Sequence, residues 1–208
     1  MRGFICDPSS AYHVTSRCIN RDWFAMPIND VWKIFATNLK FVSSAYEIRV
    51  HAFILMSNHF HLLATAPRAN LSLAMNYFLA QTSRHIVHDS NRINHTFARK
   101  FKRCRVDTIF YFLNCYKYIY QNPLRAGICA RVEDYPFSTL PGLLGLSSMI
   151  VPTLDDTLMN DIEGTLRWLN QPIQSQHIDA TRLALRKSIF KYPSKPNRSI
   201  LIDPRSLI

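Results

Sequence analysis

Hydrophobic residues recur along this chain at two spacings, and the change from one spacing to the other marks its elements. Apolar positions three and four residues apart, the pattern of an amphipathic helix, run through residues 27–44 and 70–89. Runs of β-branched and aromatic residues predict four strands, at residues 11–18, 46–56, 59–66 and 97–106. A further helix is predicted from a cap at Asp107 or Thr108 to Gln121, because Pro123 disfavours its continuation.

The order of these elements, β-α-β-β-α-β-α, predicts the fold class. Ser57-Asn58 separates two of the strands and is expected to form the tight turn of a hairpin. Paired strands that alternate with helices predict an α+β fold, a ferredoxin-like antiparallel sheet with helices packed on one face. After residue 145 the pattern changes, and helices are predicted at 155–170 and 178–191. We therefore expect a sheet domain in residues 1–145 and a helical C-terminal extension of open role in residues 146–208.

His59 and His61 stand one residue apart within an apolar run. Successive side chains of a strand point to opposite faces, so both imidazoles are expected to project from the same face. Imidazole is a good ligand for divalent transition metals, but two ligands leave a site incomplete. An H-x-H pair is a weak signal by itself, and its apolar surroundings and the basic chain strengthen it. We expect half of a metal site here.

The helix predicted to end at Gln121 carries Tyr118, and Asn122 follows four residues later. Side chains at i and i+4 lie on one side of a helix, so both can face one point. A tyrosine can attack a phosphodiester and form a covalent phosphotyrosine, but with an ordinary pKa of about 10 its hydroxyl needs a nearby cation or metal. The amide oxygen of Asn122 could join the two imidazoles around one ion. The prediction depends on whether this helix meets the histidines, because most helix tyrosines only pack.

The chain is strongly basic, with 25 Lys and Arg against 14 Asp and Glu, a formal net charge of 25 − 14 = +11. Such a charge on a folded protein attracts polyanions, of which nucleic acid is the usual one. Five cations gather just before the tyrosine helix: Arg99, Lys100, Lys102, Arg103 and Arg105. They predict a strip that binds DNA phosphates, to which Arg17, Arg21 and Arg125 add. The alternative is a charged strand edge that prevents aggregation.

Other classes of protein are disfavoured by what the sequence lacks. The five cysteines are odd in number and form no C-x-x-C pair, which argues against a zinc ribbon or a disulfide framework. No signal peptide core and no run of about 18 apolar residues is present. We expect a cytoplasmic protein with reduced thiols and no membrane partner. Only Asp89 is acidic within residues 48–106, so a carboxylate-based two-metal nuclease is not expected.

Three segments occur in a diagnostic order: residues 12–17 (Tyr-His-Val-Thr-Ser-Arg), 57–63 (Ser-Asn-His-Phe-His-Leu-Leu) and 118–127 (Tyr-Ile-Tyr-Gln-Asn-Pro-Leu-Arg-Ala-Gly). With them the chain resembles the single-tyrosine HUH transposases, specifically the REP-associated tyrosine transposase branch, over about residues 10–140. It departs from that pattern at Cys18, where the family usually has glycine, and at Phe137, where it has tryptophan. Neither departure removes a candidate catalytic group.

The resemblance implies a catalytic domain in residues 1–145 that uses Mg²⁺ or Mn²⁺ and acts on single-stranded or hairpin repeat DNA. It implies that His59 and His61 are metal ligands, that Tyr118 is the nucleophile and that Asn122 is the third ligand. Cleavage would leave a 5′-phosphotyrosine and a free 3′-hydroxyl that can rejoin to another end. Whether the protein is a monomer or a homodimer, and whether Tyr118 serves its own subunit, stays open.

Two other functions remain to be weighed. A catalytically silent protein that binds structured nucleic acid would bind DNA or RNA in a salt-sensitive way and form no adduct. A metal-dependent hydrolase of small substrates would act without DNA, and would leave the charge of +11 unexplained.

Overall fold

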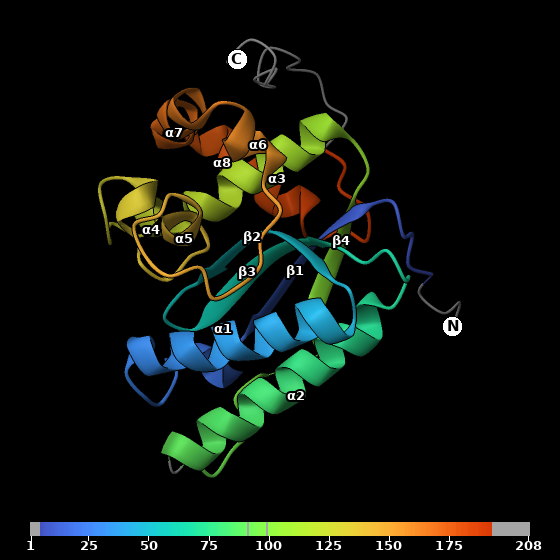
Figure 1. Cartoon of the computed structure of the whole chain (residues 1–208), viewed down its shortest axis with the longest axis vertical. Coiled ribbons are helices and arrows are strands. Elements are labelled where there is room, and N and C mark those ends of the chain that lie inside the picture. The colour runs from blue at the N-terminus through green and yellow to red at the C-terminus, as the bar shows by residue number, and fades with distance from the viewer. Residues whose placement is uncertain (1–4, 91, 99, 193–208) are drawn as a thin grey trace.

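A four-stranded antiparallel sheet forms the centre of the computed structural model, which describes residues 5–90, 92–98 and 100–192 (Figure 1). The strand order is β2-β3-β1-β4, and every neighbouring pair is antiparallel. The strands are β1 (Ala11–Arg17), β2 (Arg49–Leu55), β3 (His59–Thr65) and β4 (Lys102–Val106). The α+β fold class with an antiparallel sheet is therefore confirmed.

Helices cover both faces of this sheet (Figure 1). α1 (Ile28–Ala45) and α2 (Leu71–Ser90) pack on Tyr12, Leu62 and their neighbours, whereas α3 (Ile109–Tyr120) packs on the opposite face with Leu63. The expectation that helices pack on one face is wrong. Its physical reason lies in β3, where every residue from Phe60 to Ala64 is buried, so each face of that strand needs an apolar cover.

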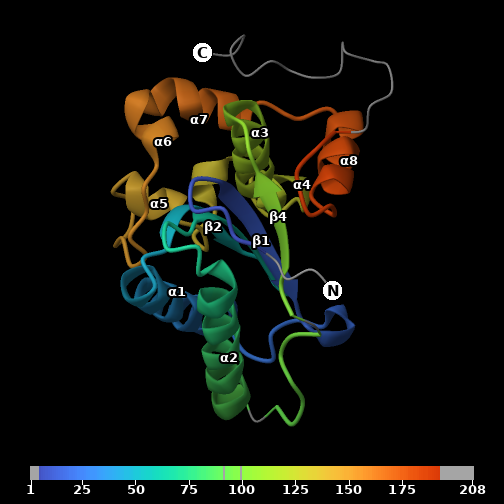
Figure 2. The same ribbon diagram turned by 90° about the vertical axis from the view of Figure 1, so that its right-hand side faces the viewer.

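The chain after α3 completes the layer on the second face (Figure 2). Leu158, Trp168 and Ala184 share one hydrophobic core with residues of α3. The division predicted at residue 145 stays a prediction, but the extension packs on the sheet domain. The extension contains α6 (Asp156–Asn160), α7 (Ile162–Asn170) and α8 (Ser175–Ala184). Between α3 and the extension lie α4 (Asn122–Arg125), the 3-10 turn η2 (Val132–Asp134) and α5 (Leu140–Leu143), and a second 3-10 turn, η1 (Ile19–Arg21), follows β1.

Both edges of the sheet are covered by chain that follows α3. At the β2 edge, Leu55 N donates to Phe137 O at 2.9 Å, and Leu154 N donates to the β2 backbone at 2.8 Å. At the β4 edge, Arg105 N donates to Ser188 O at 2.9 Å, and Phe190 N donates to Arg105 O at 2.7 Å. Paired edges of this kind protect a sheet from pairing with other chains.

Three predicted elements have different bounds in the structure. The strand predicted from residue 97 begins at Lys102, because Phe97 makes only an isolated bridge and the ladder resumes at Lys102. The helix predicted at 155–170 is divided at Asp161, whose extended backbone ends α6 and whose side chain caps α7 by accepting from Gly164 N. The helix predicted at 178–191 is α8, which ends at Ala184 because the following residues pair with β4.

Within the described residues, no helix combines the length and the apolar character needed to cross a bilayer.

Candidate active site

The hairpin of β2 and β3 places the two predicted histidines side by side. Met56 N donates to His59 O at 2.8 Å across the Ser57-Asn58 turn, so β3 begins at His59. Strand alternation then directs His59 and His61 to the face that α3 covers, with their ring centroids 5.1 Å apart. The neighbouring strand β1 pairs Thr15 with His61. Two imidazoles therefore meet in the middle of the sheet.

Asn58 determines which nitrogen of His59 carries the proton. The Asn58 Nδ2 donates to Arg21 O at 2.8 Å, and a carbonyl can only accept, so the orientation of the amide is defined. The Asn58 Oδ1 therefore faces His59 Nδ1, at 2.7 Å, and must accept from it. A neutral His59 with its proton on Nδ1 has a free lone pair on Nε2. This is the tautomer that a metal ligand needs.

His61 is held in a similar way by His13, a residue of β1 to which no role was predicted. His13 Nε2 lies 2.8 Å from His61 Nδ1, and the two rings stack with centroids 5.0 Å apart. One nitrogen of this pair donates to the other. When His61 Nδ1 is the donor, His61 Nε2 keeps a free lone pair, as in His59. The pairing joins residues 48 positions apart, so no local pattern points to it.

Burial keeps all three imidazoles uncharged near neutral pH. It lowers the pKa of His13 to about 3 and, together with the nearby Arg17, lowers the pKa of His59 to about 4. The pKa of His61 is well below its ordinary value, first through burial and then through its two histidine neighbours and nearby arginines. Neutral imidazoles are the form that binds a metal, so binding would not have to displace protons from them.

α3 brings the predicted nucleophile to these histidines. The Tyr118 ring stands nearly perpendicular to the His61 ring, with centroids 5.8 Å apart, and it lines the same cleft. The other two tyrosines of this turn point elsewhere: Tyr116 donates to Asp155 at 2.6 Å, and the Tyr120 hydroxyl lies 2.9 Å from Thr139 Oγ1. The phenol on α3 and the imidazoles on β3 therefore converge within one chain.

Arg125 joins Tyr118 to Asn122. Its guanidinium lies over the Tyr118 ring, 4.1 Å from the centroid, and its Nη2 donates to Asn122 Oδ1 at 2.7 Å. Burial lowers the pKa of Arg125, and the adjacent Tyr118 opposes this shift. The Asn122 amide also donates to Tyr118 O at 3.0 Å, and Asn122 does not line the cleft. Its predicted role as a third ligand stays a prediction, and it requires Arg125 to release the amide oxygen.

The side chains converge in a cleft of about 590 Å³. Besides Tyr118 and the three histidines, its lining contains six cations, and no Asp or Glu is among the described residues that line it. An excess of positive charge in the lining of a cleft attracts an anionic substrate. The six cations are Arg17, Arg21, Lys100, Lys102, Arg182 and Arg186.

The predicted DNA-binding cations are only partly brought together. Arg17, Lys100 and Lys102 line the cleft, whereas Arg103 and Arg105 alternate to the other face of β4. Arg105 forms an ion pair with Asp107 at 2.7 Å, and the Arg103 guanidinium lies 5.6 Å from the centre of the Phe101 ring. Arg99 lies outside the described residues, and Arg125 stacks on Tyr118 as described above. The DNA-binding roles of all these residues stay predictions.

Sequence reasoning missed Arg182 and Arg186. Their spacing of four residues was visible, but charged residues at that spacing are common on exposed helices. Nothing local indicated that α8 would reach the cleft.

Two imidazole nitrogens could supply two of the six ligands that Mg²⁺ or Mn²⁺ takes. Among the described residues, no group of three His, Cys, Asp or Glu side chains could hold a metal on its own. Any remaining protein ligand would therefore be an amide or a phenol, and substrate oxygens or water would complete the shell. Imidazole donors suit Mn²⁺ better than Mg²⁺, which prefers oxygen.

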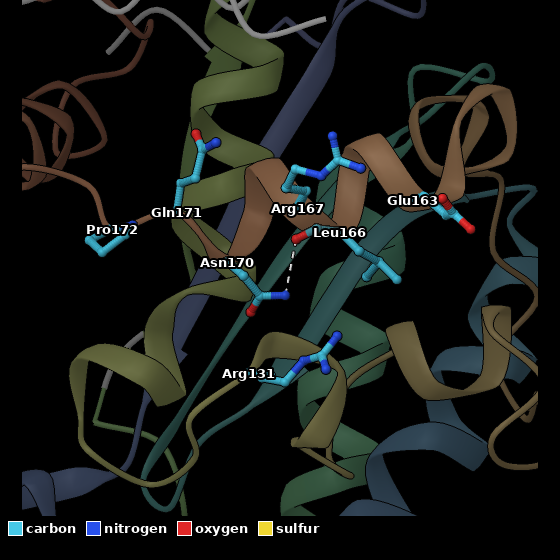
Figure 3. Close-up of a pocket in the computed structure, with 7 residues that line it drawn as sticks. All are labelled: Arg131, Glu163, Leu166, Arg167, Asn170, Gln171 and Pro172. Carbon is cyan, nitrogen blue, oxygen red and sulfur yellow. Dashed lines mark hydrogen bonds between the residues drawn. The ribbon is translucent and has the colours of Figure 1, made fainter.

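A second hollow of about 560 Å³ lies beside α7, apart from these residues (Figure 3). Arg131 faces α7 across it, and α7 contributes Glu163 and Arg167. Arg131 is paired with Glu133. No histidine or tyrosine is among the described residues that line this hollow.

Comparison with known proteins identifies a family and solved structures to which this chain is similar. The family model of IS200-like transposases matches residues 8–122, more than half of the chain. A REP-associated tyrosine transposase, solved bound to a REP hairpin, has a similar fold with a TM-score of 0.58 and 19% sequence identity. That match covers 74% of this chain and 91% of the other.

A second solved protein, a candidate transposase of Deinococcus radiodurans R1, matches with a TM-score of 0.38 and 14% identity, over 62% of this chain and 90% of the other. No curated protein matches the chain by sequence.

Proposed function

Since the chain belongs to the family of IS200-like transposases, we propose that it cleaves and rejoins one strand of single-stranded or hairpin repeat DNA through a covalent phosphotyrosine on Tyr118. The observation that carries this proposal is the approach of the Tyr118 ring to the His61 ring, 5.8 Å between centroids, in a cleft lined by cations. A tyrosine nucleophile, imidazole ligands and an anion-binding wall are the parts that such a reaction needs.

The reaction is a balanced exchange of phosphodiester bonds. The Tyr118 oxygen attacks the scissile phosphorus and loses its proton, the bond from phosphorus to the 3′-oxygen breaks, and that oxygen takes up a proton. The products are a 5′-phosphotyrosine and a free 3′-hydroxyl. Attack by the same or another 3′-hydroxyl reverses the step and releases Tyr118, so no external energy source is consumed. Arg125 over the phenol ring favours the developing phenolate.

The chain's own residues would hold an Mg²⁺ or Mn²⁺ ion through His59 Nε2 and His61 Nε2, with Asn122 as a third ligand if Arg125 releases it. When bound, such an ion supplies polarisation of the scissile phosphate. Asn58 keeps His59 in the tautomer that leaves Nε2 free, and His13 does the same for His61 when His61 Nδ1 is the donor. Since Tyr118 and the histidines meet within one chain, we propose that the tyrosine acts on the site of its own subunit.

Replacing Tyr118 by Phe tests the nucleophile directly. The variant is incubated with labelled hairpin DNA and Mn²⁺, and the adduct is measured as a band shift on a denaturing gel. We expect the adduct to vanish while DNA binding stays nearly unchanged, because only the attacking oxygen is lost. Tyr111→Phe, at the start of α3 and away from the cleft lining, is the matched control and should form adduct normally.

An undiminished adduct in Tyr118→Phe would contradict the assignment. No adduct from the unaltered protein at any metal concentration, together with salt-sensitive binding, would favour the catalytically silent binding protein. One observation favours that alternative: the Asn122 oxygen is engaged by Arg125 rather than turned to the histidines.

A further inference from the structure

One wall of the cleft belongs to the C-terminal extension, outside the residues that the family model matches. Arg182, Leu185 and Arg186 line the cleft from α8 and the turn that follows it, and the family match ends at residue 122. We propose that Arg182 and Arg186 bind backbone phosphates of the DNA strand in the cleft, so that the strand lies between α8 and the sheet. This inference rests on the proposed function, because it takes DNA as the substrate.

The position of α8 over the cleft is defined by several contacts. Its last residue, Ala184, is fully buried, and its carbonyl accepts from the Cys104 thiol of β4 at 3.6 Å. Thr181 Oγ1 lies 3.0 Å from the Tyr192 hydroxyl. Past the helix, residues 188–190 pair with Arg105 on the edge of β4, and the buried Phe190 packs on Tyr111 of α3. These contacts hold α8 and the turn that follows it in one position, with α8 on the same side of the sheet as α3 (Figure 2).

Both side chains are exposed and can take up an anionic partner. Arg182 forms an ion pair with Asp179 at 3.2 Å, but both side chains are more than half exposed, at 53% and 70%. Exposed pairs of this kind contribute little stability, so a phosphate can replace the carboxylate. Guanidinium groups bind phosphate through two parallel hydrogen bonds, which makes arginine suited to hold a DNA backbone.

The opposite wall supplies a second set of cations. Arg17 and Lys102 lie on the sheet side, and no carboxylate is among the described lining residues. Because burial leaves His13, His59 and His61 uncharged, the positive field of the cleft comes from its lysines and arginines. A strand between two cationic walls would pass beside Tyr118, which lines the same cleft.

The test is the salt dependence of DNA binding by the full chain. A labelled single strand of mixed sequence and about 16 nucleotides is titrated in EDTA, and Kd is measured by fluorescence anisotropy at several NaCl concentrations. Each phosphate contact with a single strand contributes about 0.7 to the slope of log Kd against log salt. We expect the double variant Arg182→Ala, Arg186→Ala to lower that slope by about 1.4 and to weaken binding.

The matched control changes two arginines that line the other hollow, Arg131→Ala with Arg167→Ala, and should leave the slope unchanged. The double variant Arg182→Lys, Arg186→Lys should keep most of the slope, because the charges remain. An unchanged slope in the first variant, or an equal loss in the control, would overturn the inference.

The measurement needs neither metal nor Tyr118, so failure of the cleavage reaction does not affect it. If the unaltered protein does not bind DNA at all, both this inference and the proposed substrate are overturned.

Discussion

The cleft at the histidines and the hollow beside α7 are nearly equal in size, about 590 Å³ and about 560 Å³, and both contain arginines. They differ in what surrounds those arginines. The hollow contains Glu163, and its Arg131 is already paired with Glu133. The cleft also has one paired arginine, Arg182 with Asp179, but its six lining cations face no carboxylate among the described lining residues. It also brings together buried groups from β1, β3 and α3. Size therefore does not distinguish the two regions, whereas the excess of cations and the converging buried imidazoles do.

The comparison also shows which polar groups remain available to bind a ligand. His59 and His61 each have Nδ1 engaged, by Asn58 and His13, so that only Nε2 is available. Around the hollow, the Asn170 Nδ2 donates to Leu166 O at 3.0 Å (Figure 3). It also donates to Glu133 at 2.8 Å. The cleft holds groups that are oriented but incompletely bonded, which is the condition of a binding site.

The largest expected effect is loss of the two imidazoles. The double variant His59→Ala, His61→Ala should lose metal-dependent adduct formation by about 10³-fold or more, because a metal contributes several kcal/mol to the stabilisation of a phosphoryl transition state. The initial rate of adduct formation with Mn²⁺ is the measurement. His88→Ala, at an exposed position on α2, should keep the normal rate.

The same variants test whether Tyr118 acts on the histidine site of its own subunit or on that of a partner subunit. A mixture of Tyr118→Phe and the double histidine variant should form no more adduct than either alone, since phenol and imidazoles meet within one chain. Restored activity in the mixture would show that the tyrosine serves a partner subunit.

A smaller effect is expected at His13, which orients His61 without reaching the metal position itself. His13→Ala should weaken Mn²⁺ binding by about 10- to 100-fold, the usual loss when the partner of a metal ligand is removed. Isothermal titration calorimetry with Mn²⁺ measures this without any reaction. His13→Asn can still accept from His61 Nδ1 and should recover part of the affinity. Equal affinity in all three proteins would show that His13 only fills space.

The pH dependence of stability should have opposite signs at two buried groups, His13 of the cleft and Asp155 outside it. The pKa of His13 is lowered to about 3, so the unfolded chain binds more protons and acidification below about pH 6.5 destabilises the fold. Burial instead raises the pKa of Asp155, beside α6, to about 6, so the folded chain binds more protons between about pH 4 and 6. Ionised Asp155 therefore weakens the fold as the pH rises through that window.

Asp155→Asn isolates the second effect. The amide oxygen can still accept from Leu158 N, and the amide nitrogen can donate to the Tyr116 oxygen, which reverses that bond, while the side chain carries no charge. Relative to the unaltered protein, the free energy of unfolding of this variant should be higher at pH 7 than at pH 4 by about 2–3 kcal/mol. Urea unfolding at both pH values measures it. A difference that is the same at both pH values would contradict the raised pKa.

The smallest effect is expected in the hollow. Arg167→Ala should change the free energy of unfolding by less than about 0.5 kcal/mol and leave adduct formation unchanged, because Arg167 lies on the surface of α7, away from the cleft. A loss of adduct formation in this variant would show that the hollow also contributes to the reaction.

Much of this arrangement was predictable because it depends on local pattern. Alternation along β3 placed His59 and His61 on one face, and the helix signal before Pro123 placed Tyr118 on α3. The spacing of four residues between Tyr118 and Asn122 was visible too, but it did not reveal that Arg125 would hold the amide oxygen. Local periodicity describes one element at a time, so it cannot report which groups from other elements compete for a side chain.

The amino-acid sequence by itself determined the strands, the main helices, the family and the histidine and tyrosine candidates, since each depends on residues close together in the chain. Only the tertiary structure decided that His13 meets His61, that β4 turns Arg103 and Arg105 away from the cleft, and that α8 and the turn after it line the cleft with Arg182 and Arg186. These outcomes depend on strand register and on the packing of segments that are distant in the sequence. Such packing results from many weak contacts together, so it cannot be predicted from any single residue.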